Sequence, residues 1–180
     1  PLMAGAAIFK ICVTGCAAHG SEPHRGKDAT TVSAAIINAL QQCVSRMNDP
    51  RSPLVLTIGT IHGGTRFNII PNEVGMEGSV RTFEDGTAVK EMMRRIIENT
   101  AAAFDTTAEF SFEMITPPLI HSDEKLVQLA RNAAVKLYGE QNVCDMKPLM
   151  GSEDFAFYVQ KIPGVFGIIG IRDDAKGYIY

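Results

Sequence analysis

The spacing of apolar residues changes in a fixed order between residues 8 and 114. Alternation with a period of two, typical of half-buried strands, marks residues 8–14, 54–61, 72–81 and 106–114. Helical spacing with one apolar stripe follows the first and the third of these segments. The order strand, helix, strand, strand, helix, strand is that of the ferredoxin-like fold. We therefore predict an α+β, ferredoxin-like βαββαβ domain, whose four-stranded antiparallel sheet carries both helices on one face and polar side chains on the other.

Several expected elements have a defined end or an apolar face. Asp28 is expected to cap the first helix, because its carboxylate can accept hydrogen bonds from the first free backbone N–H groups. Pro50 ends that helix, since proline cannot continue the hydrogen-bond ladder. The second helix is expected to bury one stripe, formed by Val89, Met92, Met93, Ile96, Ile97 and Phe104.

A proline-rich break at residues 116–118 interrupts this pattern. We expect a domain at residues 5–115 and a separate segment at residues 116–180. The segment is expected to contain a helix capped by Ser122, a strand at residues 143–146, a short helix capped by Ser152 and a doubly buried strand at residues 165–171. Roughly 60 residues cannot close a core around such a strand. Residues 116–180 are therefore expected to be part of an incomplete domain of a larger protein.

The composition argues against two classes of function. The chain has 17 Lys and Arg residues against 20 Asp and Glu residues, whereas nucleic-acid binding needs clustered positive charge. The expected third strand also carries Gly75, Glu77 and Ser79 where an RNA-binding sheet presents aromatic residues. No apolar run reaches the ~18 residues of a membrane span, and no signal peptide is found. We therefore expect neither a nucleic-acid partner nor a membrane partner.

The four cysteines are Cys12, Cys16, Cys43 and Cys144. Cys12 and Cys16 would lie about 13 Å apart in an extended strand, too far for a disulfide. None of the spacings is that of a zinc site. We expect reduced, mostly buried thiols in a cytoplasmic protein.

His19 and His24 lie in the polar stretch 15–28, between the first strand and the first helix. Such connections commonly display binding and catalytic groups. The two imidazoles could be ligands, acid–base groups, hydrogen-bond donors or solvated surface residues, and their spacing alone leaves these alternatives open. His62 and His121 are expected to be structural or exposed.

Three further positions have both a structural and a functional interpretation. Asn68 follows two glycines and could be a turn residue or a binding residue. Arg81 could form a surface ion pair with Glu84 or Glu109, or receive a ligand carboxylate. The turn at Gly151 and Ser152 could begin a capped surface helix or hold an anion.

Three stretches together resemble the amidohydrolase branch of the dinuclear-zinc aminoacylase and carboxypeptidase family. The stretch CAAHGSEPHRGKD is similar to that branch's GGHGAxPHxGxDP, and GGTRFNIIPNEVGMEGSVRTF is similar to GGTAxNVIPDxxxLxGTVRTF. The third, MGSEDFAFY, is similar to GGEDFAxY. The branch includes hippurate hydrolase, N-acyl-amino-acid amidohydrolase and auxin-conjugate hydrolase. The resemblance implies that residues 5–115 are the lid, or dimerisation, domain and that residues 116–180 belong to the catalytic domain.

Individual roles follow from the resemblance. His19 matches the lid histidine that polarises the scissile carbonyl in the partner subunit's active site. Asn68 matches the lid asparagine that also reaches the substrate across the dimer, and Arg81 matches the arginine that binds the substrate's carboxylate. Gly151 and Ser152 match a turn that lines the same pocket.

The sequence also departs from the family pattern. Arg66 replaces a small residue, and Ser152 stands where the branch often has glycine. His24, in contrast, matches the second histidine of the motif, which is expected to contact the substrate. The family's HxCGHD ligand motif and its Glu-Glu-Gly base motif are absent from this sequence. We therefore expect no metal ligands and no cofactor in this chain, and two divalent metals, expected to be zinc, in the intact parent.

The resemblance thus implies a homodimeric metal-dependent amidohydrolase or peptidase that cleaves N-acyl amino acids or similar carboxylate-bearing substrates. This chain would supply dimerisation and substrate contacts and would be inactive alone. The alternative is a stand-alone, non-catalytic dimerisation or ligand-binding module of ferredoxin-like fold.

Overall fold

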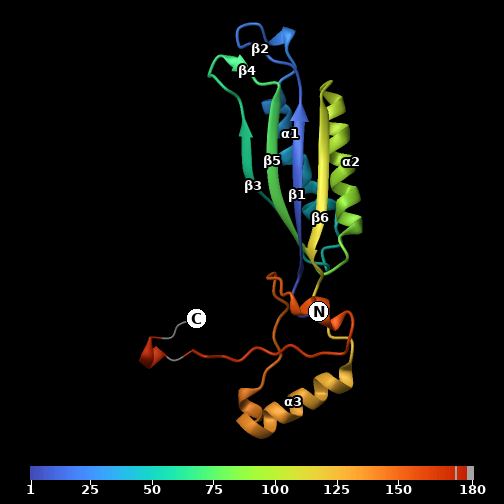
Figure 1. Cartoon of the computed structure of the whole chain (residues 1–180), viewed down its shortest axis with the longest axis vertical. Coiled ribbons are helices and arrows are strands. Elements are labelled where there is room, and N and C mark those ends of the chain that lie inside the picture. Colours follow the sequence, from blue (N-terminus) through green and yellow to red (C-terminus); the bar gives the residue numbers. More distant parts are fainter. Residues whose placement is uncertain (173, 178–180) are drawn as a thin grey trace.

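The computed structural model describes residues 1–172 and 174–177, and Figure 1 shows a sheet-and-helix body at one end of an elongated molecule. The sheet contains β1 (Gly5–Thr14), β3 (Leu54–Gly63), β5 (Glu73–Thr82) and β6 (Thr107–Thr116). All neighbouring strands are antiparallel, in the order β3-β5-β1-β6. This is the ferredoxin-like arrangement, and the predicted fold is confirmed.

Two helices cover one face of the sheet. Helix α1 (Ala29–Gln42) continues into one π-helical turn, η2 (Cys43–Met47), and α2 (Thr87–Ala103) packs beside it. The core between the helices and the sheet buries long apolar side chains from both layers, including Phe9, Ile11, Ile36, Leu40, Met76, Met93 and Ile97. The apolar faces predicted from the alternation are the ones that the helices cover.

The two helices of this domain begin and end close to the positions expected from the sequence, with one exception. The Asp28 carboxylate accepts hydrogen bonds from the backbone N–H groups of Thr30 and Thr31, so its predicted role as a cap is confirmed. Phe104 does not join the buried stripe of α2. The helix ends at Ala103, and Phe104 leaves the helical path and is 55% exposed. The stripe therefore ends with Ala101, which is buried.

The uncovered face of the sheet is mostly polar, as predicted, although Ile8 and Val55 are also exposed on it. Lys10 and Glu77 form an ion pair of 2.8 Å across β1 and β5. Their mutual hydrogen bond raises the pKa of Lys10 and lowers the pKa of Glu77. Both side chains are more than half exposed, so this pair adds little to stability.

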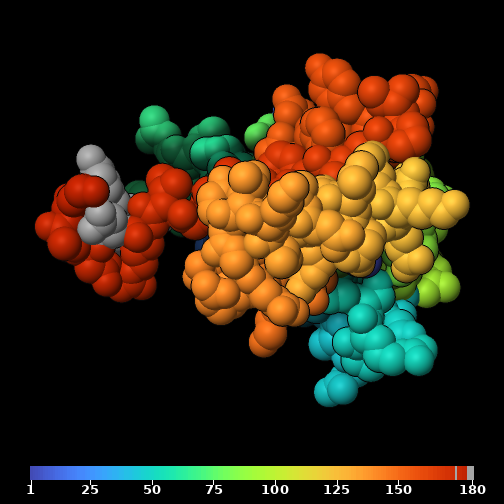
Figure 2. All heavy atoms as spheres, turned by 90° about the horizontal axis from the view of Figure 1, so that it is seen from below, coloured from blue at the N-terminus to red at the C-terminus, as the bar shows by residue number. Residues whose placement is uncertain are grey.

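The chain beyond the sheet is less well packed. It contains α3 (Glu124–Tyr138), η3 (Glu140–Asn142), α4 (Phe155–Val159) and η4 (Asp174–Lys176). A small core, formed by Leu119, Ala156 and Val159, packs against Leu2, Met3, Phe155 and Phe166. Seen from below, α3 covers much of this end, and the stretch leading to η4 extends sideways from the body (Figure 2).

Four expectations for this segment were wrong. Asp123 caps α3 instead of Ser122, because its carboxylate accepts a hydrogen bond from the Leu126 N–H group. Helix α4 begins at Phe155, so Ser152 is not its cap. Residues 143–146 and 165–171 form no strand, because no described segment pairs with their backbone.

The beginning of the chain joins the sheet to this segment. Leu2 donates a backbone hydrogen bond to Leu119 and accepts one from Leu149, each of 2.9 Å. The strand β1 starts directly afterwards, and its residue Ala6 pairs with Thr116 at the end of β6. The sheet is therefore entered and left at neighbouring points.

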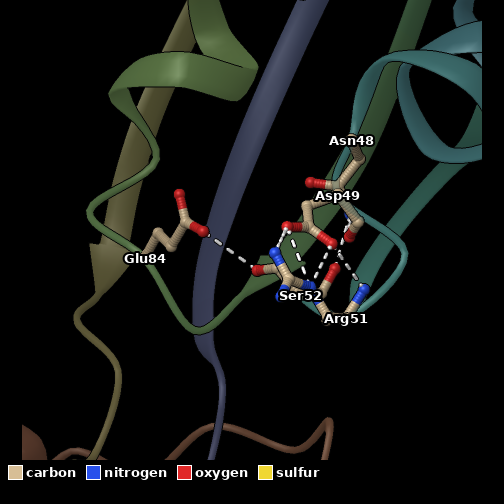
Figure 3. A network of polar contacts seen from close by, with 5 residues as sticks. All are labelled: Asn48, Asp49, Arg51, Ser52 and Glu84. Carbon is tan, nitrogen blue, oxygen red and sulfur yellow. Dashed lines mark hydrogen bonds and ion pairs between the residues drawn. The ribbon is translucent and has the colours of Figure 1, made fainter.

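At the same end, the loop after η2 is fixed by polar contacts (Figure 3). Asp49 binds the Arg51 guanidinium at 2.7 Å, and Asn48 donates to the Ser52 carbonyl. The Ser52 hydroxyl donates to Glu84 at 2.9 Å. These contacts join the loop before β3 to the turn before α2.

Candidate functional site at two ends of the sheet

The loop that carries His19 is closed at its base. Cys16 and Lys27 exchange two backbone hydrogen bonds of 2.9 Å. Gly15 is required beside this pair, because a Cβ atom there would lie 2.1 Å from the Lys27 carbonyl oxygen. The polar stretch therefore projects from the end of β1 as a defined loop.

A second loop is paired with it. The short strands β2 (Ala18–His19) and β4 (Ile69–Ile70) form a two-stranded sheet in which His19 lies opposite Ile69. The Gly20 N–H group donates to the Asn68 carbonyl at 2.8 Å. The structure thus brings His19 and Asn68 together. We call residues 18–20 and 66–70 the distal tip, and Figure 1 shows β2 and β4 beyond the end of the main sheet.

Hydrogen bonding fixes the tautomer of His19. Its Nδ1 atom lies 3.2 Å from the Ser21 backbone N and 2.7 Å from the Ser21 Oγ atom. A backbone N–H group can only donate, so Nδ1 is the acceptor and the proton of the neutral ring is on Nε2. His19 is exposed, and it can therefore present an N–H donor to a ligand from outside.

His24 lies in the exposed turn η1 (Pro23–Arg25). Glu22 and Arg25 form an ion pair of 3.2 Å beside it. Among the residues that the structure describes, the His24 ring makes no hydrogen bond. The structure thus leaves His24 as an exposed side chain of the same loop as His19.

Arg81 and Ser152 come together at the opposite end of the sheet. Arg81 lies on β5 between Ala6 and Val55, and its Nη1 atom donates to the Ser152 Oγ atom at 2.8 Å. Within the described part of the chain, no carboxylate pairs with Arg81, which is a partly buried residue. The alternative of a surface ion pair is therefore wrong. We call Arg81, Gly151 and Ser152 the hinge-end cluster.

Gly151 adjoins Ser152 and is exposed. A Cβ atom at this position would meet only the end of the Met3 side chain, at 3.3 Å. An unpaired guanidinium beside a hydroxyl and an open glycine can receive a planar carboxylate through two parallel hydrogen bonds.

The two groups of residues are far apart in one chain. Arg81 pairs with Ala6, whereas Glu73, at the other end of β5, pairs with Thr14. Eight residues of strand separate these positions, about 26 Å at the usual rise per residue. The distal tip lies beyond Thr14, so His19 and Arg81 of one chain cannot contact the same small molecule.

The described residues do not fit a metal centre. Within residues 1–172 and 174–177, no three His, Cys, Asp or Glu side chains are grouped as metal ligands. All four cysteines are free, but only Cys43 is buried, so the expectation of mostly buried thiols was wrong. Cys16 and Cys144 are exposed because they lie in loops.

Sequence patterns missed two features of the site. Phe67, at the distal tip, is fully exposed, with a relative accessibility of 103%. Its apolar character beside Ile69 and Ile70 gave no sign of exposure. The histidine partner Ser21 was also missed, although a hydroxyl two residues after a loop histidine is a recognisable local signal.

The fold defines an α+β ferredoxin-like domain with polar loops at one end. Residues 3–105 match the peptidase dimerisation domain of the M20 family, and the chain belongs to this family. This membership confirms the family that the three motifs indicated. No helix in the described part of the chain is long and apolar enough to cross a membrane.

Named relatives and a solved structure support the same family. The chain is 35% identical over 183 residues to thermostable carboxypeptidase 2 of Saccharolobus solfataricus, covering all of this chain and 46% of the relative. It is 39% identical over 176 residues to N-acetyl-L-cysteine deacetylase of Bacillus subtilis, covering 97% of this chain and 42% of the relative. The chain thus spans less than half the length of these relatives.

A crystal structure described as a dinuclear metal-binding peptidase of the M20 family, from Bacillus subtilis, has the same arrangement. Its TM-score is 0.70 at 35% identity, over 91% of this chain and 40% of that one.

Proposed function

We propose that this chain is part of a metal-dependent amidohydrolase or peptidase that cleaves an amide bond of N-acyl amino acids or similar carboxylate-bearing substrates. Residues 5–115 would be its lid and dimerisation domain, and residues 116–180 part of its catalytic domain. The observation that carries the proposal is the unpaired Arg81 guanidinium beside Ser152, in a chain of the peptidase dimerisation family. The names of two relatives, thermostable carboxypeptidase 2 and N-acetyl-L-cysteine deacetylase, support this substrate class.

In this proposal the hinge-end cluster binds the carboxylate. The guanidinium of Arg81 supplies charge and two aligned donors, and Ser152 keeps the group oriented. Gly151 leaves space for the substrate beside them. A substrate without a carboxylate would lose these contacts.

The distal tip polarises the scissile carbonyl. The Nε2–H group of His19 would donate to the carbonyl oxygen and stabilise the negative charge that develops there. Asn68 would add a contact from the same tip, and His24 a more peripheral contact with the substrate.

The separation of these groups supports a homodimer. One chain cannot place His19 and Arg81 on one small substrate, whereas a two-fold partner can bring its distal tip to the hinge-end cluster of the first chain. Each of the two sites would then contain residues from both protomers. A cytoplasmic location is part of the same proposal.

The described residues do not fit two metals, so the proposal assigns the metal ligands to the remainder of the parent protein. Two divalent ions, proposed to be zinc, would supply the activated water there. The present chain alone would bind no catalytic metal and would hydrolyse nothing.

The test is hydrolysis of N-acyl amino acids by the complete parent protein, measured beside the 180-residue chain. We expect turnover only by the complete protein, and loss of turnover in its His19→Ala and Arg81→Ala variants. Turnover by the 180-residue chain, or full activity in both variants, would contradict the proposal.

A further inference from the structure

Phe67 is the most exposed large apolar residue of the described chain. It precedes Asn68 in a turn closed by a hydrogen bond from the Ile69 N–H group to the Arg66 carbonyl at 3.3 Å. Phe67 and Asn68 are therefore the two central residues of this turn. In the single chain, the aromatic ring of Phe67 is therefore in full contact with water.

The backbone of this turn is fixed to the loop of His19. The Gly20 N–H group holds the Asn68 carbonyl, and His19 lies opposite Ile69 in the β2–β4 pair. Movement of His19 and Asn68 toward a substrate must therefore carry Phe67 with them. In the proposed dimer, the ring would therefore approach the partner's active site together with His19 and Asn68.

The direction of approach indicates what the ring meets. In the proposed function, the carboxylate of the substrate is held by Arg81 and Ser152, and the distal tip comes from the other protomer to the scissile carbonyl. The acyl group lies on the far side of that carbonyl from the carboxylate. It is therefore the part of the substrate that faces the incoming tip.

We propose that Phe67 is a specificity-determining residue, which packs against an apolar or aromatic acyl group of the substrate in the active site of the partner protomer. This inference rests on the proposed function and extends it to the substrate class. The ring would be buried by the acyl group and would select chains longer than acetyl, because each buried methylene favours binding.

The test uses the complete parent protein and one amino acid carrying acetyl, butyryl, hexanoyl or benzoyl groups. We expect Phe67→Ala to lower kcat/KM for the hexanoyl and benzoyl substrates about tenfold or more, and for the acetyl substrate less than about threefold. Phe67→Leu should retain most of the hexanoyl activity. Thermal unfolding should be unchanged, because Phe67 is exposed in the single chain.

Phe104→Ala is the matched control, since Phe104 is also an exposed phenylalanine but lies in the turn after α2. It should leave the acyl preference unchanged. An equal loss for all four substrates, no loss, or dissociation of the Phe67→Ala dimer in light scattering would overturn the inference alone. A wild-type protein that hydrolyses none of the four would overturn the proposed function, and this inference with it.

Discussion

The Nη1 atom of Arg81 lies 2.8 Å from the Oγ atom of Ser152, although 71 positions separate the two residues in the sequence. One residue belongs to the main sheet and the other to the turn before α4. This hydrogen bond holds the guanidinium at the boundary between the two parts of the chain, where its charge is available to an anionic ligand.

The first prediction concerns this pair in the complete parent protein. Arg81→Ala should lower kcat/KM for an N-acyl amino acid by about 100-fold, near 3 kcal/mol, because the substrate carboxylate loses its charged partner. Ser152→Ala should cost only about 1 kcal/mol, the typical net value of one hydrogen bond. The measurement is steady-state kinetics with the free acid and with its carboxamide.

Arg51→Ala is the control for charge alone, since Arg51 is exposed and pairs with a loop aspartate (Figure 3). It should behave as wild type. If Arg81→Ala lowered activity equally for the free acid and the carboxamide, Arg81 would not be the carboxylate-binding residue.

The second prediction tests whether each site uses two protomers. The His19→Ala and Arg81→Ala homodimers should both have strongly reduced activity. A purified heterodimer of the two variants should recover activity, because one of its two sites then combines an intact Arg81 with an intact His19 from the partner. Differently tagged subunits allow the heterodimer to be isolated and its turnover measured.

The control heterodimer pairs wild type with a protomer that carries both substitutions. In the shared arrangement, neither of its sites is complete, so it should be inactive. If this heterodimer were active and the mixed single-variant heterodimer inactive, each site would draw both residues from one chain.

The third prediction concerns pH. The Phe166 N–H group donates to the Nε2 atom of His121 at 3.1 Å, which requires that nitrogen to be unprotonated. Burial, and to a smaller extent the positive N-terminus, lower the pKa of His121 from 6.5. The unfolded chain therefore binds this proton more readily. The stabilising effect is complete above about pH 6.5 and is lost as the pH falls through the lower folded-state pKa.

Amide hydrogen exchange at Phe166, corrected for intrinsic rates, measures this effect. Protection should decrease between about pH 7.5 and 5.5 in the wild-type chain. His121→Gln keeps an acceptor but cannot titrate, so its protection should be independent of pH. Equal pH dependence in both proteins would show that another group is responsible.

The fold of residues 5–116 could be predicted because its local patterns are self-sufficient. Ile11 and Met76 alternate with polar neighbours and meet on the face that the helices cover. Asp28 has its cap role within three residues of sequence. Such short-range signals need no knowledge of the rest of the protein.

The features that could not be predicted depend on contacts with residues that are distant in the sequence or absent from this chain. The residues from 165 to 171 are apolar enough for a buried strand, but Ile169 is 74% exposed because no described strand lies beside it. The contact between Arg81 and Ser152 depends on the position of the second segment, which periodicity cannot give. The exposure of Phe67 similarly depends on the turn at the distal tip.

Because Ala6 pairs with Thr116, the chain enters and leaves the main sheet at neighbouring positions. A domain whose two ends lie this close together can be inserted into a larger protein without displacing the segments on either side. Backbone hydrogen bonds of Leu119 with Leu2 and Met3 hold the chain segments before and after the sheet side by side. The length of the sheet, set by ten-residue strands, would fix how far the distal tip of one protomer reaches into its neighbour in the proposed dimer.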